Sequence, residues 1–139
     1  MGLRAWLSER FSKKSLGQRG EDAAARYLKR QGYRILARGL DSRLGELDII
    51  AVDGRTIVFV EVKTRRSTEA GHPTEAIDPR KERRMTQAAL AYLKAQRLLN
   101  YAARFDVIAI TWPRDARRPS AIEHVKNAFE PAGRGQFYT

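Results

Sequence analysis

Two apolar runs on either side of one turn signal constrain this fold more than any other feature. Leu47–Val52 and Ile57–Val62 consist mainly of Val, Ile, Leu and Phe, the pattern of strands that are covered on both faces. Asp53-Gly54 between them signals a two-residue hairpin loop, because the favoured turn needs positive φ at both central residues. The two runs are therefore predicted to form an antiparallel hairpin.

Charged residues interrupt these runs and need a physical reason. If Val52 pairs with Arg55, Glu46 lies opposite Glu61, whereas a bulge or a three-residue loop would break this register. Because side chains alternate along a strand, four charged residues then share one face: Glu46, Asp48, Glu61 and Lys63. Facing like charges destabilise a sheet, and a divalent cation would reverse that effect.

Length and composition point to a small basic domain. The chain has 139 residues, a formal net charge of +11 and a pI near 10.5, which favours a polyanionic partner such as nucleic acid. It has no cysteine and two histidines, so oxygen atoms are the expected metal ligands. One domain is predicted over 17–130, with a flexible tail over 131–139.

The sequence contains no signal for membrane insertion or export. No apolar run reaches the roughly 18 to 20 residues of a membrane span, and no uninterrupted apolar stretch follows the start. The protein is therefore expected in the cytoplasm. Residues 1–16 are predicted to be a basic, loosely ordered extension, with an amphipathic helix that touches membrane or nucleic acid as the alternative.

A first helix is predicted over Gly17–Gln31. Ser15 and Gln18 have the spacing of a capping box, and Gly32 ends the helix. Glu21 falls on the inward stripe of this helix, where it could reach a site. The alternative is a first-turn glutamate that complements the helix dipole.

A second helix begins at Asp78-Pro79, a cap followed by proline at the first helical position. Its first turns carry four cations at the positive end of the helix dipole: Arg80, Lys81, Arg83 and Arg84. This placement favours phosphate binding over a solvated basic face. Lys81 also falls on the inward stripe of the helix.

Further elements complete a mixed sheet covered by helices. Strands are predicted over 33–38, 104–112 and 121–125, with a mobile connection over 39–45 that carries Arg43. Residues 64–78 are predicted to be a functional loop with Arg65 and Arg66. Asp106 and His124, both inside strands, are interpreted as structural.

The residues named so far carry a resemblance to a known family. The matching segments are Gly20-Glu21, Arg43-x-Gly45-Glu46-x-Asp48, Phe59-Val60-Glu61-Val62-Lys63-x-Arg65, Lys81, Arg104-Phe105-Asp106 and Asn127-Ala128-Phe129. The chain is identified on these segments as a member of the YraN family of predicted endonucleases. One stretch departs from the family pattern, because Gly39-Leu40-Asp41 replaces an Asn-aromatic-Arg character.

The resemblance implies a fold, a reaction and roles for particular residues. The family is similar to archaeal Holliday junction resolvases, so it implies a restriction-endonuclease-like mixed β-sheet flanked by helices and makes a homodimer an expectation. Glu21, Asp48 and Glu61 would hold Mg²⁺ or Mn²⁺, and Lys63 would act with Asp48 and Glu61 in catalysis. Glu46 is a candidate for an additional site carboxylate.

The expected activity is metal-dependent hydrolysis of phosphodiester bonds in DNA, including branched or structured DNA. Six cations would hold the backbone without reading bases, which implies weak sequence preference: Arg43, Arg65, Arg66, Lys81, Arg83 and Arg84. The alternative is a non-catalytic nucleic-acid-binding module of nuclease ancestry, in which Glu61, Lys63 and Arg65 form ordinary ion pairs. RNA also stays open as a substrate.

Overall fold

The structure is a computed structural model that describes residues 14–131, and the predictions for 1–13 and 132–139 lie outside this range. Its elements are α2 (Leu16–Arg30), β1 (Arg34–Ser42), β2 (Gly45–Asp53), β3 (Thr56–Arg65), η1 (Thr68–Ala70), η2 (Pro73–Ala76), α3 (Pro79–Ala95), β4 (Ala103–Thr111) and β5 (Ala121–Phe129). The strands form one sheet in the order β1-β2-β3-β4-β5. The pair β3 and β4 is parallel and the other neighbouring pairs are antiparallel.

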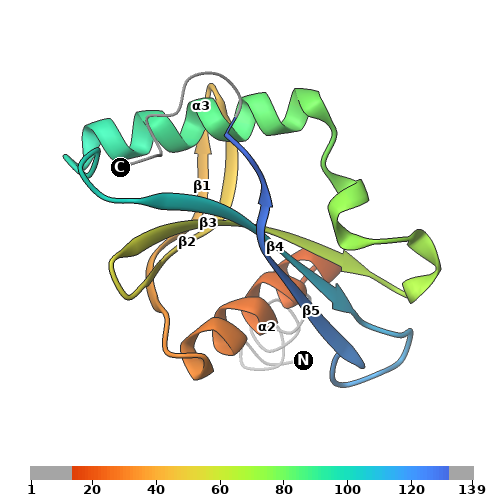
Figure 1. Cartoon of the computed structure of the whole chain (residues 1–139). Helices are drawn as coiled ribbons and strands as arrows, with labels where there is room; N and C mark the ends of the chain where they lie inside the picture. The colour runs from red at the N-terminus through yellow and green to blue at the C-terminus, as the bar shows by residue number, and fades with distance from the viewer. Residues whose placement is uncertain (1–13, 132–139) are drawn as a thin grey trace, which may run out of the picture.

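The helices α2 and α3 cover opposite faces of this sheet (Figure 1). Along β3, Val58 and Val60 belong to the core under α2, whereas Ile57 and Phe59 belong to the core under α3. Both faces of this strand are buried, which explains its nearly continuous apolar sequence. The predicted α/β class, a mixed sheet flanked by helices, is confirmed.

Both predicted helix starts are confirmed. Ser15 caps α2, and Ser15 and Gln18 form the complete capping box through reciprocal side-chain-to-backbone hydrogen bonds of 3.1 Å. Asp78 caps α3 by accepting a hydrogen bond of 2.8 Å from the Lys81 backbone, with Pro79 at the first helical position. The caps satisfy N–H groups that have no partner within the helix.

The hairpin between β2 and β3 forms, but the predicted register is wrong by two residues. Asp53 pairs with Thr56, so the loop is Gly54-Arg55 and not Asp53-Gly54. Only Gly54 in this loop has a positive φ, 62°, which fits a turn that needs glycine at its first central position. A shift by two residues does not exchange the faces of the paired segments 49–53 and 56–60.

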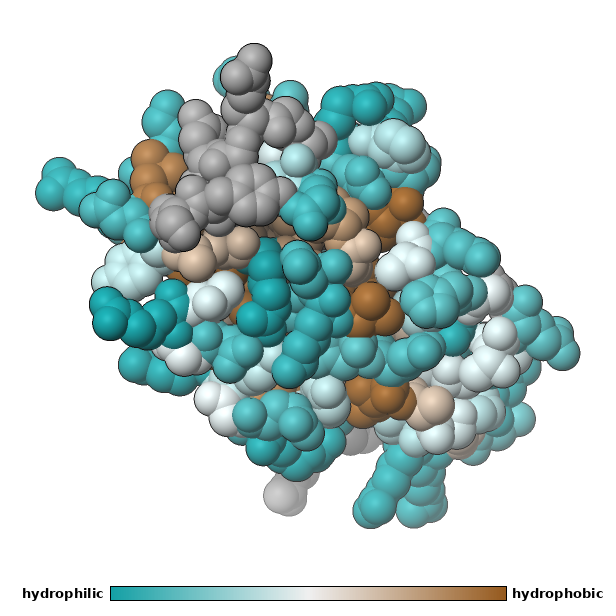
Figure 2. Space-filling model, viewed as in Figure 1, coloured by the Kyte–Doolittle hydropathy of each residue, from teal (hydrophilic) through white to brown (hydrophobic). Residues whose placement is uncertain are grey.

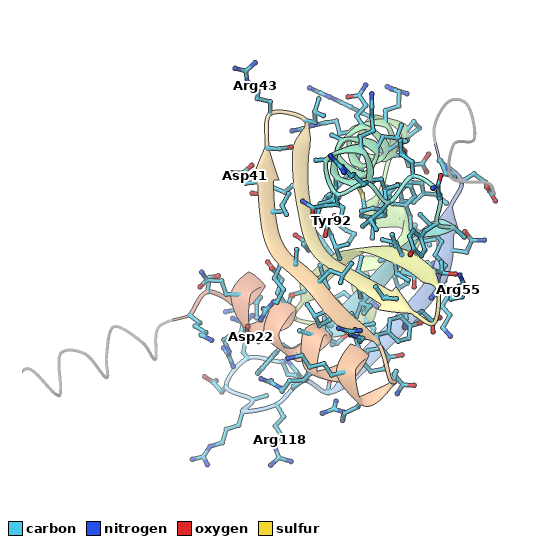
Figure 3. The ribbon with its side chains drawn as sticks, turned by 90° about the vertical axis from the view of Figure 1, so that its left-hand side faces the viewer. Asp22, Asp41, Arg43, Arg55, Tyr92 and Arg118 are labelled. Carbon is cyan, nitrogen blue, oxygen red and sulfur yellow. The ribbon has the colours of Figure 1, made fainter. Side chains whose placement is uncertain are left out.

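The connection predicted over 39–45 is wrong. β1 continues through Gly39, which takes a φ of 58°, to Ser42, and Arg43 and Leu44 form the turn of a second hairpin with β2. The two strands curve together from the level of α2 toward α3, with Arg43 at the tip (Figure 3). Glu46 pairs with Asp41 of β1, and the shifted β2–β3 register sets Asp48, not Glu46, opposite Glu61.

Two other boundaries differ from the predictions. β3 extends to Arg65, so the predicted loop over 64–78 begins later and contains two short 3-10 helices. β5 runs to Phe129 and not to Val125, and its end packs by stacking of Phe129 on Phe105 at 4.6 Å between ring centroids. This aromatic contact lies beyond the segment that the sequence pattern marked as a strand.

Hydrophilic side chains cover most of the face drawn in Figure 2, and hydrophobic ones form small separate patches. No helix within residues 14–131 is long and apolar enough to cross a membrane.

Candidate active site

An open cleft of about 560 Å³ lies between the β1–β2 hairpin and the start of α3. Its lining is mainly polar and charged and comes from β1, β2, β3 and the start of α3: Asp41, Ser42, Gly45, Glu46, Asp48, Glu61, Asp78, Arg80, Lys81, Arg84 and Met85. The curvature of the hairpin creates the cleft, because it brings the far end of β2 beside α3. Two of the predicted catalytic carboxylates therefore face one concave surface.

Asp48 and Glu61 are neighbours across β2 and β3. The backbone pairing ends at Ile49 and Val60, and one further step sets Asp48 opposite Glu61. There the Asp48 Oδ2 atom accepts a hydrogen bond of 2.8 Å from the Val62 backbone N–H. A side chain thus replaces the next backbone contact between the strands, and this contact fixes the position of the carboxylate.

Glu61 is held against α3. Its side chain is 10% exposed, and its Oε1 atom accepts a hydrogen bond of 2.6 Å from the Lys81 ammonium group. Lys81 itself is 44% exposed at the cleft wall. The predicted inward orientation of Lys81 is consistent with this contact.

Burial raises the pKa of both carboxyl groups. Burial, followed by the charge of Asp48, raises the pKa of Glu61 to about 7, against the opposing effect of Lys81. Burial is also the main cause that raises the pKa of Asp48, and Glu46 adds to it, while the Val62 N–H opposes it. The pair therefore resists carrying two negative charges at neutral pH.

Glu21 lies close to this pair on α2. Burial, then the charge of Asp48, raises the pKa of Glu21, and Glu46 contributes in the same direction. The preceding residue allows this approach, since a Cβ at Gly20 would collide with the Thr64 side chain on β3. The close packing of α2 on β3 thus depends on glycine at position 20.

Lys63 follows Glu61 by two residues on β3, so both side chains lie on one face of the strand. Lys63 is exposed, and its charge lowers the pKa of Glu61. Glu46 is exposed in the cleft lining. The shifted register sets Asp48 rather than Glu46 opposite Glu61. Leu47 and Ile50 both pack in the core under α3, so the strict alternation that predicted one shared face for Glu46 and Asp48 does not hold along this part of β2.

The six predicted nucleic-acid contacts do not form one group. Lys81 and Arg84 line the cleft, Arg83 is exposed outside its lining, and Arg43 projects from the hairpin tip (Figure 3). Arg65 is 12% exposed and donates a hydrogen bond of 2.6 Å to the Gly71 carbonyl. It holds the loop after β3.

Arg66 lies in a different groove and donates to the Trp112 carbonyl at 3.4 Å. The cleft in turn contains two carboxylates that were not predicted as site residues, Asp41 and Asp78. The sequence pattern places Asp41 in a connection, and only the β1–β2 pairing brings it to the cleft. The pattern predicts Asp78 as a helix cap, and its place just before Lys81 and Arg84 in the sequence is the feature that indicates a second role.

Asp106 forms a separate polar network under α2. It is fully buried, and its carboxylate accepts hydrogen bonds from Arg104 at 3.0 Å and from the Asn127 backbone at 2.9 Å, with His124 Nε2 at 2.8 Å. Although burial opposes it, hydrogen bonding lowers the pKa of Asp106. The structural interpretation of Asp106 and His124 agrees with this network, and Tyr27 continues it at 3.1 Å from His124 Nδ1.

Among the described residues, no group of three or more His, Cys, Asp or Glu side chains is arranged to hold a metal ion as it stands. Asp48 and Glu61 form a pair, and Glu21 approaches from a different element.

The comparisons with known proteins agree with the resemblance to the YraN family. The sequence model of uncharacterised protein family UPF0102 matches residues 20–110. A UPF0102 protein of Rhodopirellula baltica is 46% identical over 98% of this chain and 86% of its own length. One of Geobacter sulfurreducens is 55% identical over 86% of this chain and 91% of its own length.

Proposed function

The chain belongs to the UPF0102 family, and we propose that it is a metal-dependent endonuclease that hydrolyses phosphodiester bonds in DNA with weak sequence preference. One observation carries the proposal. Asp48 and Glu61 are held side by side at the wall of an open cleft, although burial raises the pKa of both and the charge of Asp48 raises the pKa of Glu61 further. Lys81 lowers the pKa of both carboxyl groups, yet both stay raised, so one ammonium group does not offset the cost of burying the pair.

The donor atoms at the cleft fit Mg²⁺ or Mn²⁺. These ions prefer oxygen ligands, and Mg²⁺ keeps several waters, so that one or two carboxylates and the phosphates of the substrate suffice to bind it. A closed cage of three side chains is not required. Asp48 and Glu61 would hold the ion, with Glu21 as a further carboxylate close to Asp48.

When bound, the ion makes hydroxide accessible near neutral pH and offsets charge on the phosphoryl oxygens. The protein supplies position and fixed charge. Val62 fixes Asp48 through its backbone N–H, and Lys81 fixes Glu61. Lys63, exposed on the same strand face as Glu61, would stabilise negative charge that develops on the phosphoryl group or orient the attacking water.

The opposite wall of the cleft suits a phosphate group. Arg80, Lys81 and Arg84 line it at the N-terminal end of α3, where the helix dipole also favours anions. These cations would contact the DNA backbone without reading bases, which supports weak sequence preference.

The test is cleavage of labelled duplex, junction, flap and single-stranded DNA in Mg²⁺ or Mn²⁺. Asp48→Asn should reduce cleavage by about 10³-fold, because the loss of several kcal/mol of metal-assisted stabilisation costs one factor of ten per 1.36 kcal/mol. Asp53→Asn, which changes an aspartate of the Arg104 network, is the matched control and should retain activity. Equal cleavage by wild type and Asp48→Asn, or cleavage in EDTA, would contradict the proposal.

The contact between Lys81 and Glu61 favours a second candidate, a nucleic-acid-binding module that does not cut. An ammonium group already neutralises Glu61 there. In this case DNA binds across the panel and no strand is cleaved with either metal. A saturable Mn²⁺ site that is lost in Asp48→Asn would argue against this candidate.

A further inference from the structure

A second charged region lies on the α2 side of the molecule. Two grooves separate α2 from the loop between β4 and β5, with volumes of about 540 and 470 Å³. Five arginines at these grooves are exposed and are called the arginine surface here: Arg26, Arg30, Arg114, Arg117 and Arg118. In Figure 3, Arg118 lies beside α2 at the opposite end of the molecule from Arg43.

The loop between β4 and β5, which carries Arg114, Arg117 and Arg118, is held in place by Trp112 and Arg19. Trp112 Nε1 donates a hydrogen bond of 2.8 Å to the Ala116 carbonyl, and Arg19 donates to the same carbonyl at 3.3 Å. The Arg19 guanidinium also lies 4.2 Å from the centre of the Trp112 ring. Arg19 and Arg66 therefore anchor the loop, so that it is ordered before any ligand arrives.

The arginine surface has no internal charge partner within residues 14–131. None of its five arginines forms an ion pair with a described residue. The linings of the two grooves together contain seven arginines and a single carboxylate, Asp115. Exposed cations that are fixed close together repel one another, and an anionic ligand removes this repulsion.

The acidic cleft has the opposite balance. Its lining contains five carboxylates and three cations, so the cleft alone attracts a polyanion poorly. The excess of positive charge in this basic chain is thus not found in the cleft lining. Affinity for a nucleic acid must come largely from another surface, because phosphate neutralisation supplies most non-specific binding energy.

We propose that the arginine surface binds the phosphate backbone of a nucleic-acid segment other than the one that enters the acidic cleft. This inference rests on the proposed function only for the role of the cleft. The helices α2 and α3 cover opposite faces of the sheet (Figure 1), so a substrate that reaches both regions extends around the molecule. Guanidinium groups match phosphate oxygens through two parallel hydrogen bonds, which favours arginine over lysine at such a surface.

The experiment measures binding without cleavage. A fluorescent DNA duplex of about 30 base pairs is titrated in EDTA at several salt concentrations, and its anisotropy gives Kd. The triple variant Arg114→Gln/Arg117→Gln/Arg118→Gln should lower the slope of log K against log salt by about 2.7, which is about 0.9 for each lost phosphate contact. The control Arg55→Gln/Lys94→Gln/Arg97→Gln removes the same charge from exposed positions outside both grooves and should leave the slope nearly unchanged.

Equal slopes for the two triple variants would overturn the inference. Binding of vesicles of phosphatidylglycerol that is lost in the arginine variant, while DNA binding is unchanged, would also overturn it in favour of a membrane surface. A reduced DNA slope in the arginine variant supports the inference even if Asp48→Asn does not affect cleavage. That last combination would reject the proposed nuclease site alone.

Discussion

Asp48 and Asp106 are both carboxylates on interior strands of one sheet, and their surroundings are opposite. Asp106 accepts hydrogen bonds from Arg104 and the Asn127 backbone and contacts His124, so its pKa is lowered in spite of complete burial. Asp48 accepts one backbone hydrogen bond and faces Glu61, and its pKa is raised. Burial is the same kind of cost at both sites, and only Asp106 has partners that compensate for it.

This difference separates a structural carboxylate from a candidate functional one. The Asp106 network joins β4, β5 and α2, and it needs no further partner. The Asp48–Glu61 pair is open to solvent through a cleft and would gain from a divalent cation, which reverses the effect of two facing negative charges. Perturbed carboxyl groups in a cleft are typical of functional sites.

The largest expected difference in stability tests this comparison directly. Asp106→Asn should lower the free energy of unfolding by about 3 kcal/mol, because it removes the buried negative charge that Arg104 and His124 contact, and only Arg104 keeps another carboxylate partner, Asp53. Asp48→Asn should change it by less than about 1 kcal/mol, or stabilise the protein, since it relieves repulsion with Glu61. Urea unfolding at neutral pH in EDTA measures the free energy of unfolding of each variant. Equal losses in the two variants would contradict the difference between Asp48 and Asp106.

The pH dependence of stability should have opposite signs at the two sites. The pKa of Glu61 rises from 4.5 to about 7 on folding, so its contribution is complete below pH 4.5 and is lost as pH rises through 7. The pKa of Asp106 falls below 3.8, so its contribution is present above that pH and is lost in more acidic solution.

Unfolding of the metal-free protein across this pH range measures both contributions. Glu61→Gln should flatten the loss of stability between pH 4.5 and 7 and leave the loss of stability below pH 3.8 unchanged. Asp106→Asn should reduce the loss of stability in acid and leave the loss between pH 4.5 and 7 unchanged. If stability falls between pH 4.5 and 7 in Glu61→Gln as it does in wild type, another group causes this loss.

The smallest effect concerns Lys81. Lys81→Met removes the ammonium group from Glu61, so the pKa of Glu61 should rise further. The change should be worth less than about 1 kcal/mol, because Lys81 is 44% exposed and water screens its charge. Carboxyl-carbon NMR titration measures the shift, with Arg83→Met on the same helix as the control. A Glu61 that titrates identically in both variants would remove Lys81 from the account of the site.

The strong local signals of the sequence predicted the central hairpin and both helix starts. The glycine of the β2–β3 turn, the capping box at Ser15 and the Asp78-Pro79 pair each determine backbone geometry within a few residues. The register was missed by two residues because one positive φ, at Gly54, is sufficient for the observed loop. A shift by two residues does not exchange the faces of the paired strands, so Asp48 and Glu61, predicted to lie in one cluster, lie opposite each other.

Features that depend on distant segments could not be predicted in this way. The turn of the β1–β2 hairpin, Arg43-Leu44, contains no glycine, so the sequence does not signal it. Gly39 lies within β1, although glycine in a sequence usually indicates the end of a strand. Asp41 was therefore missed at the cleft. The arginine surface was missed for a related reason, since α2 and the β4–β5 loop are remote in sequence and meet only through the order of the sheet.

Mn²⁺ binding to Asp48 and Glu61 can be followed by electron paramagnetic resonance, because the signal of free Mn²⁺ falls as the protein binds it. We expect a saturable site in wild type and in Asp53→Asn that is lost in Asp48→Asn, with protons released as the carboxyl groups ionise. The absence of a saturable site in wild type, or an equally strong site in Asp48→Asn, would contradict the assignment of Asp48 and Glu61 as a metal-binding pair.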